Sequence, residues 1–380
     1  MTESSNLMPT AHRSARLAAI DVMRGMVMVL MALDHASHAF NAGRYVKDSY
    51  AWYPAGAEIP TLQFFLRWVT HLCAPTFLFL AGFVLALSVA RRQTRGEPER
   101  TIDKDIFIRG IFIMLLDPLW MRFGFGHRTV LQVLYAIGAS FCLMAPLRRL
   151  GMRSLFAIGL GLFLFGEALM GLALWAGIDQ RPGLIGTFFV TGGTVTKGVY
   201  VLYPLLPWLA YMILGWVCAR HMLVTKDFNP VAFFLKAGVV SLITFLTVRG
   251  FNHYGNMLLY RYDHSIPQWL HVSKYPPSLS FAALELGLMF LILAFLFAVY
   301  QKRKPSPANP LLVFGRTPLF FYILHVHLLM LAAWVLKLYR TGGLAETGLA
   351  TVAVLLVLYP LCRRYDRFKR AHPKSLFRYL

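Results

Sequence analysis

Charged residues are scarce in this 380-residue chain. Only 14% of its residues are Asp, Glu, Lys or Arg, whereas 57% are hydrophobic and the mean hydropathy is +0.56. A soluble domain carries about 25% charged residues. The longest hydrophilic stretches, 1–15, 91–105 and 363–380, are too short to fold around a core of their own. The composition therefore excludes a soluble protein and indicates a polytopic helical membrane protein.

Cysteines and acidic residues are also few. The four cysteines lie inside or at the edge of apolar segments, without the close Cys/His spacing of zinc or redox sites, so we expect no metal. Asp and Glu number 17 against 38 Lys and Arg, which gives a net charge of +21. Membrane proteins place such an excess on cytoplasmic loops, where it faces anionic lipid. We therefore expect no nucleic-acid partner.

Hydropathy predicts an all-α fold of about ten membrane-spanning helices. Of the 38 Lys and Arg, 23 lie in the two tails and in alternate loops, which predicts that both termini are cytoplasmic. We expect a cytoplasmic tail over 1–15, a transmembrane domain over 16–363 and a basic tail over 364–380, in a multi-pass protein of the plasma (inner) membrane. The predicted spans are 17–40, 64–90, 106–120, 129–147, 153–177, 199–219, 231–248, 278–300, 311–336 and 344–362.

The first predicted span carries ionisable residues at both ends. An Asp, Lys or Arg at the centre of a spanning helix costs roughly 2.5–3.5 kcal/mol, so such groups usually face a polar cavity or a partner. At the start, Asp21 and Arg24 are three residues apart. They can pair with each other, or Arg24 can reach an anionic cofactor. Both interpretations remain open from the sequence.

At the other end of this span, Asp34 and His35 lie at the level predicted for His71, which begins the second span. A short outer loop joins the two spans, so the three groups can share one cavity. A carboxylate that orients an imidazole is the usual construction of a general base. Asp34, His35 and His71 are therefore the candidate catalytic residues. The alternative is that they only form polar contacts between helices.

The outer loops 41–63, 178–198 and 249–277 carry Tyr, Trp, His, Asn and Gly, which is typical of a binding surface or of an aromatic belt at the membrane interface. Arg249, Asn252 and Lys274 are the candidate substrate-binding residues, together with His325 of the ninth span. His325 and His327 are two residues apart and point to different faces of a helix. They make a poor pair of metal ligands.

Six runs of this sequence together resemble the heparan-alpha-glucosaminide N-acetyltransferase-like family of transmembrane acyltransferases. The resemblance implies an enzyme that takes an acetyl group from cytoplasmic acetyl-CoA and delivers it to a sugar on the far side of the membrane. The lysosomal member of that family uses a histidine of the first luminal loop, and this chain departs from that pattern, because no histidine lies between Asn41 and Thr70. The runs are Arg16–Gly25, Asp34–His35, His71–Gly82, Tyr203–Trp208, Lys274–Ser278 and Phe314–His325.

Acyl transfer from a thioester needs a positioned donor, a base and a group that stabilises an oxyanion. Arg24, Arg109 and Arg316, near the cytoplasmic ends of spans, are the candidate ligands of acyl-CoA. The rival hypothesis is a proton-coupled transporter of a small polar or acylated solute, because intramembrane Asp, Glu and His also occur in such carriers. The expected partners are the lipid bilayer, acyl-CoA and a sugar or glycan, and a homodimer is left open.

Overall fold

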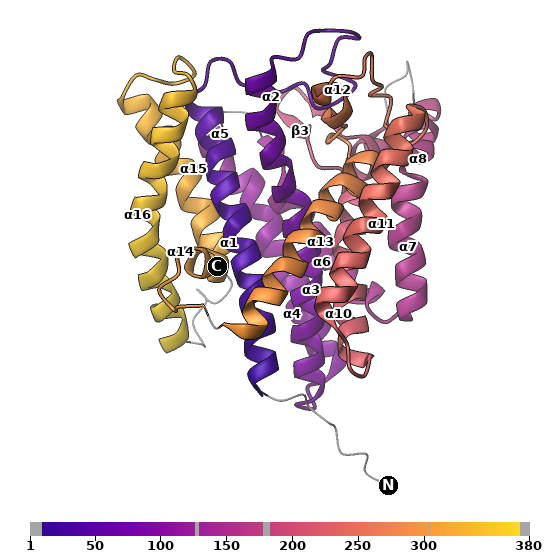
Figure 1. Ribbon diagram of the computed structural model, residues 1–380, viewed down its shortest axis with the longest axis vertical. Helices are drawn as coiled ribbons and strands as arrows, with labels where there is room; N and C mark the ends of the chain where they lie inside the picture. Colours follow the sequence, from indigo (N-terminus) through magenta and orange to yellow (C-terminus); the bar gives the residue numbers. More distant parts are fainter. Residues whose placement is uncertain (1–9, 126–128, 178–182, 304, 373–380) are drawn as a thin grey trace.

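The structure is a bundle of helices that run roughly along one axis (Figure 1). This computed structural model describes residues 10–125, 129–177, 183–303 and 305–372. The helices are α1 (Thr10–Phe40), α2 (Thr61–Trp68), η1 (Val69–Leu72), α3 (Cys73–Gln93), α4 (Glu99–Leu116), η2 (Asp117–Met121), α5 (Arg122–Phe125), α6 (Val133–Leu147), α7 (Met152–Leu164), α8 (Gly166–Trp175), α9 (Leu184–Gly186), η3 (Thr187–Thr191), α10 (Leu205–Val224), α11 (Pro230–Phe251), α12 (Ile266–Leu270), α13 (Leu279–Lys302), α14 (Pro310–Arg316), α15 (Pro318–Val335) and α16 (Leu344–Ala371).

Each of the ten ranges predicted as spans contains a helix. Among the described residues, five helices are long and apolar enough to cross a membrane, or six if the bent pair α7 and α8, with 61° between them, is one span. A mostly helical membrane protein is thus confirmed, while the number of ten spans stays a prediction. The five are Thr61–Gln93, Pro230–Phe251, Leu279–Lys302, Pro318–Val335 and Leu344–Ala371.

The bundle has two distinct ends. At one end, the start of α1 meets the end of α16, because Arg316 lies 3.7 Å from Asp21 and 4.0 Å from Asp366. We call it the basic end. At the other end, which we call the loop end, the Arg340 amide donates to the Ala39 carbonyl at 2.9 Å. The start of α1 and the end of α16 therefore lie at the same end of the bundle. That this basic end faces the cytoplasm stays a prediction.

Helices cross closely where glycines meet backbone. A Cβ on Gly82 of α3 would overlap the Met212 carbonyl of α10, and one on Gly215 of α10 would overlap the Phe79 carbonyl of α3. In the same way, Gly25 of α1 leaves room for the backbone of α14. These contacts fix α1 and α3 in the bundle, and both helices carry residues of the site described below.

A small sheet interrupts the helical fold, which the all-α prediction did not include. It comprises β1 (Thr129–Leu131), β2 (Gly193–Thr196) and β3 (Val199–Val201), in the order β1-β3-β2. β1 pairs parallel with β3 and β2 pairs antiparallel with it. Strands of three or four residues are too short for an alternating pattern to stand out in a sequence. The sheet lies at the loop end, where Val130 and Leu202 line a cavity.

Reporter fusions test the orientation predicted from the Lys and Arg distribution. Reporters placed after Lys47 and after Leu270 should be located outside the cell, and reporters after Arg95 and at Leu380 inside, because basic loops are retained in the cytoplasm. Enzymatic reporters active on only one side of the membrane provide the measurement. The reverse pattern would place the loop end in the cytoplasm and contradict the prediction.

Candidate active site

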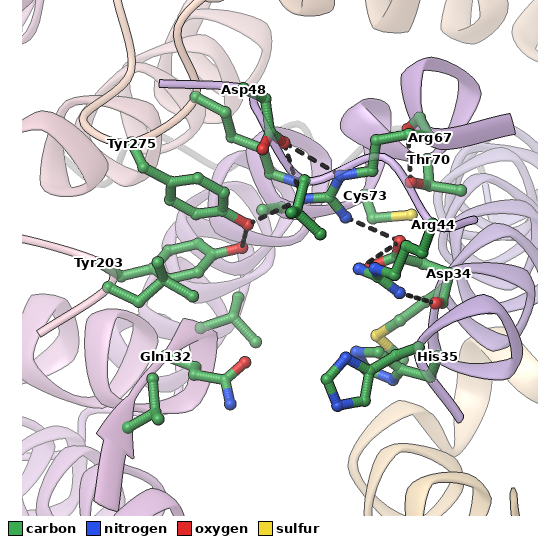
Figure 2. Close-up of a pocket in the computed structure, with 18 of the residues that line it drawn as sticks. Asp34, His35, Arg44, Asp48, Arg67, Thr70, Cys73, Gln132, Tyr203 and Tyr275 are labelled. Atoms are coloured by element: carbon green, nitrogen blue, oxygen red, sulfur yellow. Dashed lines mark hydrogen bonds and ion pairs between the residues drawn. The ribbon is translucent and has the colours of Figure 1, made fainter. Parts of the chain in front are cut away.

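A cavity of about 750 Å³ lies at the loop end. α1 and α3 form one wall, and the sheet with the segment 274–275 forms the wall across from it (Figure 2). Asp34 and His35 lie on the first wall, while Tyr203, Tyr275 and Gln132 lie on the opposite side. A molecule entering the cavity would thus have ionisable groups on one side and aromatic and amide groups on the other.

Arg67 of α2 joins two carboxylates at the first wall. Its Nη1 donates to Asp34 Oδ1 at 2.7 Å, and its Nε and Nη2 donate to Asp48 Oδ2 at 3.0 and 2.7 Å. Its Nη2 also donates to the Tyr275 hydroxyl at 3.3 Å. The side chains of Arg67 and Asp48 are 7% and 1% exposed. One guanidinium thus connects α1, α2, the loop after α1 and the segment before α13.

Asp48 is ionised in this arrangement. Burial alone would raise the pKa of its carboxyl, but the positive charge of Arg67 and a hydrogen bond from His71 outweigh burial and hold the pKa well below its usual range. The main chain of Asp48 is fixed too, since its carbonyl accepts from the Lys274 amide at 2.9 Å. The loop 41–60 is therefore held against the bundle by charge and by backbone.

The Asp34 carboxylate is bonded by two arginines that the sequence did not link to it. Its carboxylate accepts from Arg67 and forms an ion pair with Arg44 at 3.0 Å, and its carbonyl accepts from Arg44 as well. The sequence missed this because both arginines lie 10 or more residues further along the chain and no helical spacing links them to Asp34. Asp34 therefore lines the cavity as a carboxylate whose charge is balanced by Arg44 and Arg67.

His35 is oriented by His325 instead. The Phe321 carbonyl, which can only accept, lies 2.9 Å from His325 Nδ1, so that nitrogen carries the proton and His325 Nε2 holds a lone pair. His35 Nδ1 lies 2.7 Å from this Nε2 and must donate to it. Neutral His35 then has its own lone pair on Nε2. The two ring planes are nearly parallel, with 17° between them and 4.9 Å between the centroids.

His71 belongs to the charged network and does not line the cavity. Its Nε2 donates to Asp48 Oδ2 at 3.1 Å, and its side chain is 1% exposed. Its other nitrogen, Nδ1, is buried and has no hydrogen-bond partner among the described residues. Arg67 and Asp48 thus link Asp34 with His71, and of the three predicted catalytic residues Asp34 and His35 line the cavity.

A second cavity, of about 440 Å³, lies toward the basic end. Arg24 and Arg109, both predicted to hold the donor, line it, as do Arg91 and Lys369, which the sequence analysis did not select. The rest of its lining is largely apolar. Three residues, Phe77, Val133 and Tyr322, line both cavities, so the two meet at these side chains inside the bundle.

Three predicted binding residues lie elsewhere. Arg316 pairs with Asp21 and Asp366 and is not among the residues that line the second cavity. Arg249 is fully buried outside the first cavity, where it donates to the carbonyls of Gln268 and His271, both at 2.6 Å, and holds the loop after α11. Asn252 ends α11 in a left-handed conformation and bonds the Arg261 backbone.

Arg249 and Asn252 therefore have structural roles in the loop. The sequence could not distinguish them from ligand-binding residues, because a buried arginine that satisfies carbonyls has the same residue type as one that binds an anion. Lys274, also predicted to bind substrate, lines the first cavity, and His325 lies behind the wall of this cavity with no exposure. Among the described residues, no group of three or more His, Cys, Asp or Glu could hold a metal ion.

Arg44, Asp48, Arg67 and Tyr322 are the site residues that sequence reasoning missed. Arg67 had a signal, since a charge at the start of an apolar span is costly and needs a partner. Asp48 and Arg44 lie in a loop, where charges are ordinary. Tyr322 resembles any aromatic residue of an apolar helix, and only the packing places it between the two cavities.

One comparison with known proteins gives a match. The sequence profile described as "Heparan-alpha-glucosaminide N-acetyltransferase, catalytic" matches residues 16–249, which is more than half of the chain. A search of curated proteins gives no match. The matched range includes Asp34, His35, Arg67 and Arg109, while Lys274 and the helix of His325 follow it.

Replacement of Arg67 tests the charged network. Arg67→Met should lower the free energy of unfolding by about 3–5 kcal/mol, because it leaves two poorly solvated carboxylates without their shared cation. Unfolding of the purified protein in detergent measures the change. Adding Asp48→Asn should recover part of the loss, since it removes one unpaired charge. The exposed Arg95→Met is the matched control, and equal losses for Arg67→Met and Arg95→Met would contradict the role of Arg67.

Proposed function

The chain belongs to the heparan-alpha-glucosaminide N-acetyltransferase family, and from this membership we propose that it transfers an acyl group from acyl-CoA at the basic end to an amine or hydroxyl of a sugar at the loop end. Membership supports a transmembrane acetyltransferase. The donor, the acceptor and the placement in the plasma membrane with the basic end in the cytoplasm are our proposal.

The observation that carries this proposal is the meeting of the two cavities. They lie toward opposite ends of the bundle and share Phe77, Val133 and Tyr322. A thioester entering from the basic end and an acceptor entering from the loop end would come together at these residues. Such an arrangement lets an acyl group reach the far side while the nucleotide part of the donor stays where it bound.

The cavity at the basic end fits the parts of acyl-CoA. Arg24, Arg91, Arg109 and Lys369 can pair with its phosphates, and guanidinium groups do so with two parallel hydrogen bonds. The apolar lining beyond them suits a pantetheine arm. Arg24 and His35 are eleven residues apart on α1, which is about 17 Å along a helix. This distance is comparable with the length of an extended pantetheine arm.

His35 has the geometry of a general base. Its Nε2 would take the proton from the acceptor amine or hydroxyl as that atom attacks the thioester carbonyl carbon. The carbon–sulfur bond then breaks, and the proton held on Nε2 can pass to the departing CoA thiolate. His325, whose tautomer is fixed by the Phe321 carbonyl, keeps the lone pair of His35 on Nε2 and so acts as a positioning residue.

Tyr322 is placed to stabilise the oxyanion. It lines both cavities, and its ring lies edge-on to His35 with 6.0 Å between the centroids. The tetrahedral intermediate would form where donor and acceptor meet, and a preorganised hydroxyl donor there would lower the barrier. No covalent acyl-enzyme is required by this scheme.

The base is tested by single replacements. His35→Ala should lower acetyl transfer by roughly 10²- to 10⁴-fold, the usual contribution of a general base, with binding of CoA unchanged. Transfer by the purified protein and its thermal stability are measured together. His327→Ala is the matched control, because His327 lies two residues from His325 on α15 but bonds the Ile323 carbonyl and is not among the residues that line either cavity. Near-normal transfer by His35→Ala would show that the base lies elsewhere.

The donor site gives a further prediction. Arg24→Ala and Arg109→Ala should each weaken binding of CoA by about 1.5–3 kcal/mol, the value of a hydrogen bond to a charged group, with a larger effect at low salt. Calorimetric titration with CoA measures the change. Arg316→Ala removes an arginine at the same end without altering the cavity lining, so its affinity should match the wild type. Wild-type affinity for CoA in all three variants would contradict the proposed donor site.

A further inference from the structure

A third hollow, of about 410 Å³, runs between α15 and α16, and we call it the α15–α16 groove. Its lining is apolar except for Glu346, whose carboxylate accepts from the Gly343 amide at 2.7 Å and is engaged in capping α16. Several lining side chains are well exposed, including Leu336 at 60% and Leu349 at 72%. The lining residues are Phe40, Leu328, Leu329, Ala332, Leu336, Leu338, Glu346, Leu349, Ala350, Ala353, Val354 and Val357.

The groove lies directly beside the cavity at the loop end. Phe40 lines the groove and Asn41 lines the cavity, and likewise Leu338 lines the groove and Arg340 the cavity. The two segments that carry these residues are joined by backbone hydrogen bonds, among them the Gly342 amide to the Phe40 carbonyl at 2.9 Å. These two hydrogen-bonded backbone segments therefore separate the apolar groove from the polar cavity.

Two cations, Lys337 and Arg340, lie in the chain segment at this boundary. Lys337 stands between the groove residues Leu336 and Leu338, and Arg340 reaches the cavity, where its Nη2 lies 3.3 Å from His38 Nε2. Both cations are exposed, and the ion pairs of the described residues include neither of them. An anionic group at the boundary would thus meet two cations whose charges no carboxylate of the described chain neutralises.

We propose that the α15–α16 groove binds the hydrocarbon tail of a lipid-linked sugar phosphate. The tail lies along the groove, the phosphate lies between Lys337 and Arg340, and the sugar extends over the boundary into the cavity beside His35. The three parts of such an acceptor match the three parts of the site. The apolar tail fits the groove, the anionic phosphate fits the two cations, and the polar sugar fits the cavity. That the lipid is the acceptor rests on the proposed acyl transfer, whereas the lipid site itself does not.

A binding experiment tests the lipid site without any acyl transfer. The purified full chain is mixed in detergent with a polyprenyl phosphate, with the polyprenol of the same length or with inorganic phosphate, and the bound molecules are counted by native mass spectrometry. The wild type should retain the polyprenyl phosphate at least 10-fold more tightly than the other two. Retention of the polyprenol to the same degree would show that the groove holds any hydrocarbon tail, and would overturn the proposal.

Matched variants locate the site. Ala353→Trp and Leu349→Trp place an indole in the groove and should lower retention of polyprenyl phosphate at least 10-fold, while Leu356→Trp, on the same helix but outside the lining, should not. Arg340→Gln should remove much of the preference for the phosphate over the polyprenol. Unchanged retention in both groove variants, with thermal stability equal to the wild type, would place the lipid elsewhere.

A transfer assay separates the two proposals. An amino-sugar phosphate carrying a polyprenyl tail should accept acetyl groups faster than the same sugar without the tail, and Ala353→Trp should abolish only this difference. If the lipid binds in the groove but neither acceptor is acetylated, the lipid site stands and the acyl transfer fails. If both are acetylated equally, the acyltransferase stands and the lipid-linked acceptor is wrong.

Discussion

The site depends on one buried cation. Arg67 holds the carboxylates of Asp34 and Asp48 and bonds the Tyr275 hydroxyl, so it connects the end of α1, the loop after it and the segment before α13. A charge in this position loses much of its hydration, which only close and well-aligned partners offset. The shape of the cavity at the loop end is thus coupled to a charge balance: without the guanidinium, two acids would repel each other across the wall that carries His35.

This balance also bears on why an imidazole at the cavity, His35, is paired with another imidazole. An Asp34 carboxylate bonded to His35 would stabilise its cation, but Asp34 is already neutralised by Arg67 and Arg44. His325 instead fixes the tautomer of His35 through an uncharged contact anchored on the Phe321 carbonyl. A neutral imidazole keeps an accepting lone pair at the cavity wall without adding a charge to the bundle interior. The charged network around Arg67 therefore balances Asp34, while His325 orients His35, although Asp34 and His35 are neighbours on α1.

The sequence predicted the helices and the level of the site more successfully than its contacts. The costly charges of α1 pointed to Asp34 and His35, and the cationic helix ends pointed to Arg24 and Arg109, because both signals come from the expense of charge in an apolar segment. The pairings did not follow, since Arg67 and His325 meet α1 through the tertiary fold alone. Arg249 was selected for its charge, yet its hydrogen bonds go to loop carbonyls. Residue type alone does not reveal whether a buried arginine serves a ligand or the backbone.

Two hollows of the described part of the bundle combine cations with apolar side chains. Cations line the cavity near the basic end and adjoin the α15–α16 groove along the chain, and in both places the rest of the lining is largely apolar. Each arrangement suits a molecule with an anionic group next to a hydrocarbon or pantetheine arm, held by charge at one point and by burial along its length. Phe77, Val133 and Tyr322 line both cavities, so the packing of these three side chains sets how the two cavities are joined. In the proposed acyl transfer, this packing would decide whether an acyl group passes and whether water is excluded.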